Sequence, residues 1–172
     1  MNTWDRIAAT VVSEFSDLPD VEALTQVVLR LLIAALLGGL LGLQREHQGK
    51  EAGVRTHMLV ALGSALFVLV PLQAGSHSDD LSRIIQGLIA GVGFLCAGTI
   101  LKVTGEGEAD QVRGLTTAAG IWLTAAIGIA VGLGREMTGV VSTLLALAIL
   151  ALEGPVRRTV GKPRRRAPGD GP

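Results

Sequence analysis

Long apolar tracts almost free of charge alternate with short charged segments along this chain. Between positions 31 and 70, "LLIAALLGGLLGL" and "MLVALGSALFVLV" flank the charged stretch "QREHQGKEAGVRTH". A helix of about 18 or more apolar residues is long enough to cross a hydrocarbon core about 30 Å thick. The alternation therefore predicts an all-α integral membrane protein and excludes a soluble globular domain.

The apolar tracts predict a bundle of about five transmembrane helices. The expected spans are residues 24–44, 57–75, 84–102, 115–133 and 137–153. The first span has an uncharged core of 13 residues, 31–43, which is too short to cross unaided. We therefore expect Arg30 to lie near one end of this span, where its side chain can reach the membrane surface.

The basic residues predict the orientation of the bundle. With five spans, the first and third loops and the C-terminal tail carry 11 Lys and Arg, against three on the opposite side. Lys and Arg are enriched in cytoplasmic loops. We expect an acidic N-terminal segment outside (1–23), a membrane domain (24–153) and a basic, disordered cytoplasmic tail (154–172) that lies against lipid headgroups.

Two parts of the chain resemble each other. The segment "LIAALLGGLLGL" at 32–43 aligns with "LIAGVGFLCAGT" at 88–99, and Gly42 falls on Gly98. Each segment is followed by a charged loop and then by "VRTHMLVALG" or "VRGLTTAAG". The similarity indicates either a tandem two-helix repeat, as in parallel transporter repeats, or shared membrane composition.

Arg55 and Arg113 each precede an apolar helix, where the positive end of the helix dipole disfavours a cation. One interpretation is that the two arginines bind lipid phosphate and that their position reflects the general enrichment of Lys and Arg on the cytoplasmic side. The other is a polar cluster at the cytoplasmic mouth, completed by a carboxylate or an anion at the helix N-termini. The candidate cluster comprises Arg45, Glu46, Arg55, Thr56, Arg113, Thr116 and Thr117.

Glycines spaced four residues apart predict close helix packing, because small residues on one face let helix backbones approach in lipid. The predicted packing residues are three such pairs, Gly38 and Gly42, Gly87 and Gly91, and Gly128 and Gly132, together with Gly93 and Gly98. On the first span, Arg30, Ala34, Gly38, Gly42 and Arg45 lie within about 120° of one another. Such faces favour contacts within the chain, then a homodimer seam, then a substrate path.

The remaining polar residues give little sign of catalysis or metal binding. Glu106, Glu108 and Asp110 alternate in "GEGEADQ", which suits either a hard cation or, more simply, a solvated loop. The three histidines lack metal-ligand spacing, and Cys96 suits apolar packing. We find no nucleophile–base pair, P-loop or dinucleotide motif, so we expect no enzyme activity, no cofactor and no metal site.

Three segments together resemble the membrane domain of the MgtC/SapB family over roughly residues 28 to 152. They are "GGLLGLQREHQGKEAGVRTHMLVALGSALF" (38–67), "IAGVGFLCAGTIL" (89–101) and "VRGLTTAAGIWLTAAIGIAVGLG" (112–134). The resemblance implies a bacterial inner-membrane protein with about five spans. Some members are linked to growth and virulence under low magnesium and to restraint of the F-type ATP synthase. The short basic tail favours the SapB-like form without a soluble C-terminal domain.

Two functions follow from these observations. The first is a non-enzymatic accessory or regulatory factor in magnesium homeostasis or acid stress. It would contact the lipid bilayer and another membrane protein, which the resemblance implies is the F-type ATP synthase or a transporter. The second is a small transporter or channel for a divalent cation or an anion. Either function is compatible with a homodimer, and neither involves nucleic acid.

Overall fold

The structure, a computed structural model, describes residues 2–16, 18, 20–103 and 111–152. The described residues form six helices and two short strands. The helices are α1 (Thr3–Glu14), α2 (Val21–His47), α3 (Val54–Gln73), α4 (Ser78–Gly98), α5 (Leu115–Gly132) and α6 (Glu136–Ala151). The expected all-α class is confirmed. The acidic run Glu106, Glu108 and Asp110 and the tail 154–172 lie outside the described residues.

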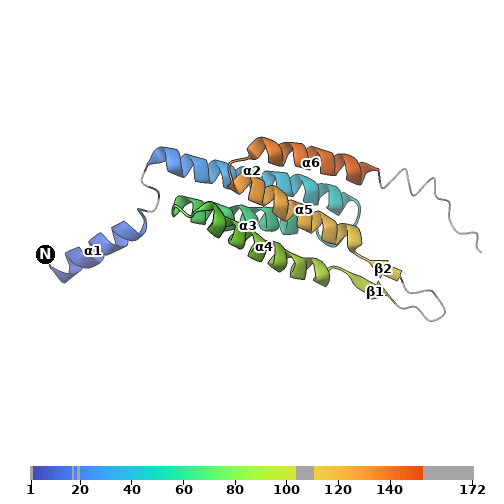
Figure 1. The fold of residues 1–172 in the computed structure, drawn as a ribbon, viewed down its shortest axis with the longest axis horizontal. Coiled ribbons are helices and arrows are strands. Elements are labelled where there is room, and N and C mark those ends of the chain that lie inside the picture. Colours follow the sequence, from blue (N-terminus) through green and yellow to red (C-terminus); the bar gives the residue numbers. More distant parts are fainter. Residues whose placement is uncertain (1, 17, 19, 104–110, 153–172) are drawn as a thin grey trace, which may run out of the picture.

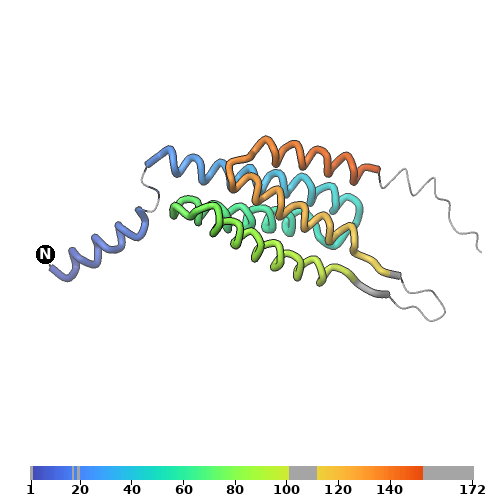
Figure 2. The backbone as a smooth tube through the Cα atoms, in the orientation of Figure 1, coloured from blue at the N-terminus to red at the C-terminus, as the bar shows by residue number. Residues whose placement is uncertain are grey.

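Helices α2 to α6 form an antiparallel bundle, and α1 lies apart from it beside the start of α2 (Figure 1). The backbone trace shows the two ends of the bundle (Figure 2). We call the end with the α2–α3 connection and the strands the hairpin end. We call the end with the start of α2 and the α5–α6 turn the N-terminal end. The α2–α3 and α4–α5 hairpins run in the same direction, as alternate hairpins do in any antiparallel bundle.

Four of the described helices, α2 to α5, are long and apolar enough to cross a membrane. Helix α6 is also apolar, but its 16 residues span only about 24 Å at 1.5 Å per residue. A crossing helix needs about 20 residues. The bundle therefore contains four full-length spans and a shorter apolar helix where a fifth span is expected.

Helix α3 lies between α2 and α5, and glycines make both contacts close. On α2, a Cβ atom on Gly38 would lie 2.5 Å from the carbonyl oxygen of His57, and one on Gly42 would lie 2.6 Å from the Cα atom of Val54. On α5, a Cβ atom on Gly128 would collide with the carbonyl oxygen of Ala61. Helix backbones that approach this closely gain dispersion contacts, which drive association in lipid. The three helices thus form the closely packed centre of the bundle.

Helix α4 lies at the edge of the bundle and is packed far less. Within the described residues it buries only Val92 and Cys96. A Cβ atom on any glycine of this helix would meet nothing within 4 Å. The structure therefore does not pack the predicted residues Gly87, Gly91, Gly93 and Gly98 against another helix of the chain.

The α4–α5 connection contains the strands β1 (Leu101–Val103) and β2 (Gln111–Arg113), which pair antiparallel with Leu101 opposite Arg113. Gly114 follows with φ of 91° and is the N-cap of α5. A Cβ atom there would collide with the carbonyl oxygen of Thr99. Only glycine fits this position, because it combines a left-handed conformation with a close backbone approach.

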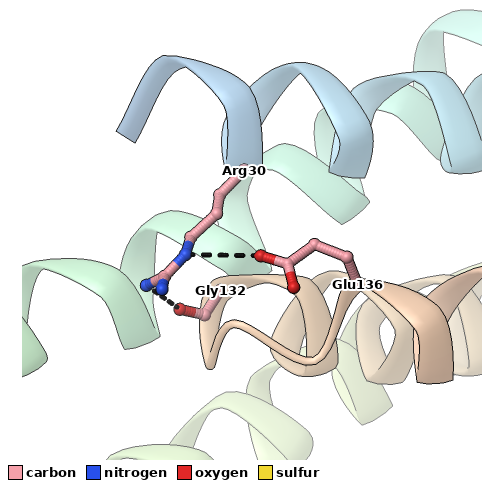
Figure 3. Close-up of polar contacts among 3 residues, drawn as sticks. All are labelled: Arg30, Gly132 and Glu136. Atoms are coloured by element: carbon pink, nitrogen blue, oxygen red, sulfur yellow. Dashed lines mark hydrogen bonds and ion pairs between the residues drawn. The ribbon is translucent and has the colours of Figure 1, made fainter. Parts of the chain in front are cut away.

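At the N-terminal end, Arg30 ties α2 to the α5–α6 turn (Figure 3). Its Nε lies 3.5 Å from Glu136 Oε1, and one terminal nitrogen donates to the carbonyl oxygen of Gly132 over 3.4 Å. That carbonyl belongs to the last turn of α5, where a cation is favoured by the helix dipole. Arg30 was expected to reach the membrane surface from near the end of its span. In the structure its side chain instead contacts Glu136 and Gly132 of the same chain.

Candidate functional site

A buried arginine marks the hairpin end of the bundle. Arg45 lies in the last turn of α2 and is 0% exposed. One terminal nitrogen donates to Thr117 Oγ1 on α5 over 3.3 Å, and the other donates to Gln48 Oε1 over 3.2 Å. A buried cation is costly unless its N–H groups are hydrogen-bonded. Arg45 therefore requires these partners to be in place.

Gln48 extends the contacts of Arg45 to a further helix. It is the C-cap of α2, and its Nε2 donates to the carbonyl oxygen of Leu150 in α6 over 3.4 Å. Thr117 belongs to the first turn of α5. The side chains of Arg45 and Gln48 thus connect α2, α5 and α6 at one end of the bundle.

Glu46 caps the start of α3. Its Oε2 accepts a hydrogen bond from the backbone N–H of Val54 over 3.1 Å. A carboxylate is favoured at a helix N-terminus because of the free N–H groups and the dipole. The N-cap residue, Gly53, has no side chain for this role, and a Cβ atom there would lie 2.6 Å from the same carboxylate oxygen.

His57 is fully buried one turn into α3. It is 0% exposed, and its Nδ1 pairs with the carbonyl oxygen of Gly53 over 3.0 Å. A carbonyl only accepts, so Nδ1 carries the proton in this bond. Among the described residues, Nε2 has no hydrogen-bond partner. Gly120 of α5 is adjacent, because a Cβ atom on it would lie 3.6 Å from Nε2.

We call these five residues, Arg45, Glu46, Gln48, His57 and Thr117, the hairpin-end cluster. They come from α2, α3 and α5 and include one buried guanidinium and one buried imidazole. Chemically, the cluster can fasten helices together or hold an anion. The buried charge of Arg45 would repel a divalent cation.

The structure separates the predicted polar residues into two groups. Arg45, Glu46 and Thr117 belong to the hairpin-end cluster. Arg55, Thr56, Arg113 and Thr116 have exposed side chains. For Thr56 and Thr116 the reason lies in helix geometry, since successive helical residues are 100° apart and the adjacent residues His57 and Thr117 face inward.

Sequence reasoning missed Gln48 and His57 as members of the cluster. A signal was present for His57, which begins a row of buried residues on α3 at helical spacing that continues through Ala61, Ala65 and Val68. Gln48 offers no such signal, because it lies just beyond the end of a helix.

Cys96 lies outside the hairpin-end cluster. The Cys96 thiol is buried and donates to the carbonyl oxygen of Ala118 over 3.1 Å, which suits a packing role. Within the part of the chain that the structure describes, no group of three His, Cys, Asp or Glu side chains is arranged to hold a metal ion.

Helices α3 and α4 enclose an apolar groove of about 660 Å³ on the side of the bundle. We call it the α3–α4 groove. Its lining includes Gly63, Gly87 and Gly91, and a Cβ atom on any of these glycines would meet nothing within 4 Å. Larger apolar side chains, including Phe67 and Leu95, also line it.

Comparison with known proteins gives consistent matches. The model of the MgtC family matches residues 31–159. Protein SrpB of Synechococcus elongatus is 48% identical over 130 residues, which cover 71% of each chain. The putative magnesium transporter YhiD of Escherichia coli K12 is 40% identical over 130 residues, 72% of this chain and 58% of YhiD.

Protein MgtC of Salmonella typhimurium is also 40% identical, over 120 residues that make up 70% of this chain. The match spans about half of that relative, 49% of its length. No solved structure matches this chain.

Proposed function

Because the chain belongs to the MgtC family, we propose that it is a non-enzymatic accessory or regulatory protein of magnesium homeostasis in the bacterial inner membrane. The name of YhiD, a putative magnesium transporter, supports the connection with magnesium. We further propose that the N-terminus lies outside and the hairpin end lies on the cytoplasmic side, because the basic residues are concentrated there.

The observation that supports regulation by contact is the α3–α4 groove. The glycines that line it, Gly63, Gly87 and Gly91, face open space, whereas Gly38 and Gly42 of α2 and Gly128 and Gly132 of α5 are in close contact with α3 or its N-cap. In lipid, a face of small residues lets another helix approach closely and gain dispersion contacts. We propose that a helix of another membrane protein binds in this groove.

The centre of the bundle supports contact rather than conduction of magnesium. The α2–α3 and α3–α5 seams are closed by backbone contacts at Gly42 and Gly128. At the hairpin end the buried Arg45 places a positive charge where a cation would have to pass. Both features disfavour a path for Mg²⁺ between these helices.

The experiment compares two glycines of α4 that both face open space. Gly91 lines the α3–α4 groove, and Gly93 lies about 200° around the same helix. A photo-crosslinking residue replaces Leu95 in the groove, and cross-linked products are identified in native membranes. We expect a second membrane polypeptide, and we expect Gly91→Leu to reduce its yield about tenfold, equivalent to 1.4 kcal/mol of binding.

The Gly93→Leu variant is the matched control and should keep the full yield. Both substitutions replace glycine by a better helix former at an open site, so neither should lower the stability of the fold. Cross-links only to lipid or to the chain itself, or equal losses in the two variants, would contradict the proposal.

Transport is a second candidate, and the hairpin-end cluster favours an anion as the substrate. Arg45 places a fully buried cation at this end of the bundle. An anion would be attracted where a divalent cation would be repelled.

A further inference from the structure

Helix α1 carries a continuous apolar face that nothing in the described chain covers. Trp4, Ile7, Val11, Val12 and Phe15 are all exposed, Trp4 by 75% and Phe15 by 83%. At 100° per residue these side chains, with Ala8, fall within an arc of about 140°. No residue of α1 is buried within the described structure.

The opposite face of α1 is polar and nearly neutral. Its charged residues are Asp5, Arg6 and Glu14, which leave a single net negative charge. The N-terminus is fixed by a capping box between Asn2 and Asp5. The helix therefore has a capped N-terminus and is amphipathic. It lacks the basic face that attracts anionic lipid.

The covalent chain holds α1 close to the membrane boundary. Six residues, 15–20, separate the end of α1 from the start of α2, which is a candidate span. Six residues extend over at most about 20 Å. The first turns of α2 are themselves apolar on the outside, with Val21, Leu24 and Val28 exposed. The apolar phase within reach of α1 is thus the bilayer that surrounds α2.

We propose that α1 lies in the membrane interface at the N-terminal end of the bundle, with its apolar face inserted between the lipid chains. Trp4 and Phe15 are at the two ends of this face, and aromatic side chains are enriched at membrane interfaces. The near-neutral polar face means that apolar insertion provides the attraction, without help from anionic headgroups.

The test places the intact chain in phosphatidylcholine vesicles and measures quenching of Trp4 fluorescence by brominated lipids. Trp122, the other tryptophan, is replaced by Phe so that Trp4 is the only reporter. We expect Trp4 to be quenched most by bromine near the headgroup end of the acyl chain. Adding phosphatidylglycerol should not increase the quenching.

Two substitutions within one turn provide the comparison. Val11→Asp places a charge on the apolar face and should lower the quenching severalfold, whereas Thr10→Asp on the polar face should leave it unchanged. Neither should unfold the bundle, because α1 buries nothing against it, and thermal unfolding checks this. Absence of quenching by any brominated lipid, or equal quenching in both variants, would overturn the proposal. So would quenching that depends on protein concentration, since it would indicate pairing of α1 with a second copy.

Discussion

Gly128→Ala should destabilise the bundle by about 3 kcal/mol, the upper range for overpacking a close contact. The added Cβ atom collides with the carbonyl oxygen of Ala61 and lies 2.9 Å from the Cβ of Ser64. The colliding atom belongs to the backbone of α3, so it cannot swing aside as a long side chain would. Helices α3 and α5 would have to separate, which removes contacts along the whole seam.

The measurement is reversible unfolding of the purified protein in mixed micelles, followed by circular dichroism. Gly91→Ala is the matched control, because a Cβ atom there meets nothing within 4 Å. It should keep or raise the stability, since alanine is favoured over glycine in a helix by up to about 1 kcal/mol. Equal stability of the two variants would show that α5 does not rest against α3 in this way.

Arg45→Ala is expected to have an effect of similar size for a different reason. The substitution removes the donor to Thr117 and Gln48 and leaves a cavity where a fully buried side chain was. Lost buried hydrogen bonds and an unfilled cavity together cost about 3 kcal/mol. We expect lower stability and loss of function under magnesium limitation, measured by unfolding and by growth of a complemented deletion strain.

Two further variants separate burial from charge in this prediction. Arg55→Ala removes an exposed arginine at the start of α3, where a cation is disfavoured by the helix dipole, so stability should change by less than about 0.5 kcal/mol. Arg45→Lys keeps the charge but not the planar guanidinium, and should give an intermediate loss. If Arg55→Ala proves as harmful to stability as Arg45→Ala, the hairpin-end cluster is not where the structure places it.

The order of the bundle helices α2 to α6 could be predicted from the sequence, because charge marks the ends of the apolar tracts. The spacing of Ala34, Gly38, Gly42 and Arg45 also predicts one face of the first span, and the structure buries all four residues. The same reasoning could not rank Arg45 above Arg55. Whether an arginine is buried depends on which side of its helix faces the neighbouring helices, and one sequence alone does not show this.

The glycines show a second limit of sequence reasoning. Gly87 and Gly91 have the same spacing as Gly128 and Gly132, yet the first pair faces open space and the second pair touches α3. Spacing indicates a face that can be approached closely, but the position of the helix in the bundle decides what approaches it. Helix α1 was not predicted, because its acidic residues indicate a segment outside the membrane, although its apolar residues have helical spacing.

We have proposed that this protein acts by contact with another membrane protein rather than by conducting magnesium. The most direct test is Mg²⁺ influx into proteoliposomes that contain the purified chain and an entrapped magnesium-sensitive dye, under an inward Mg²⁺ gradient. We predict influx equal to that of protein-free vesicles. Influx that increases with the amount of protein and saturates with Mg²⁺ concentration would contradict the account.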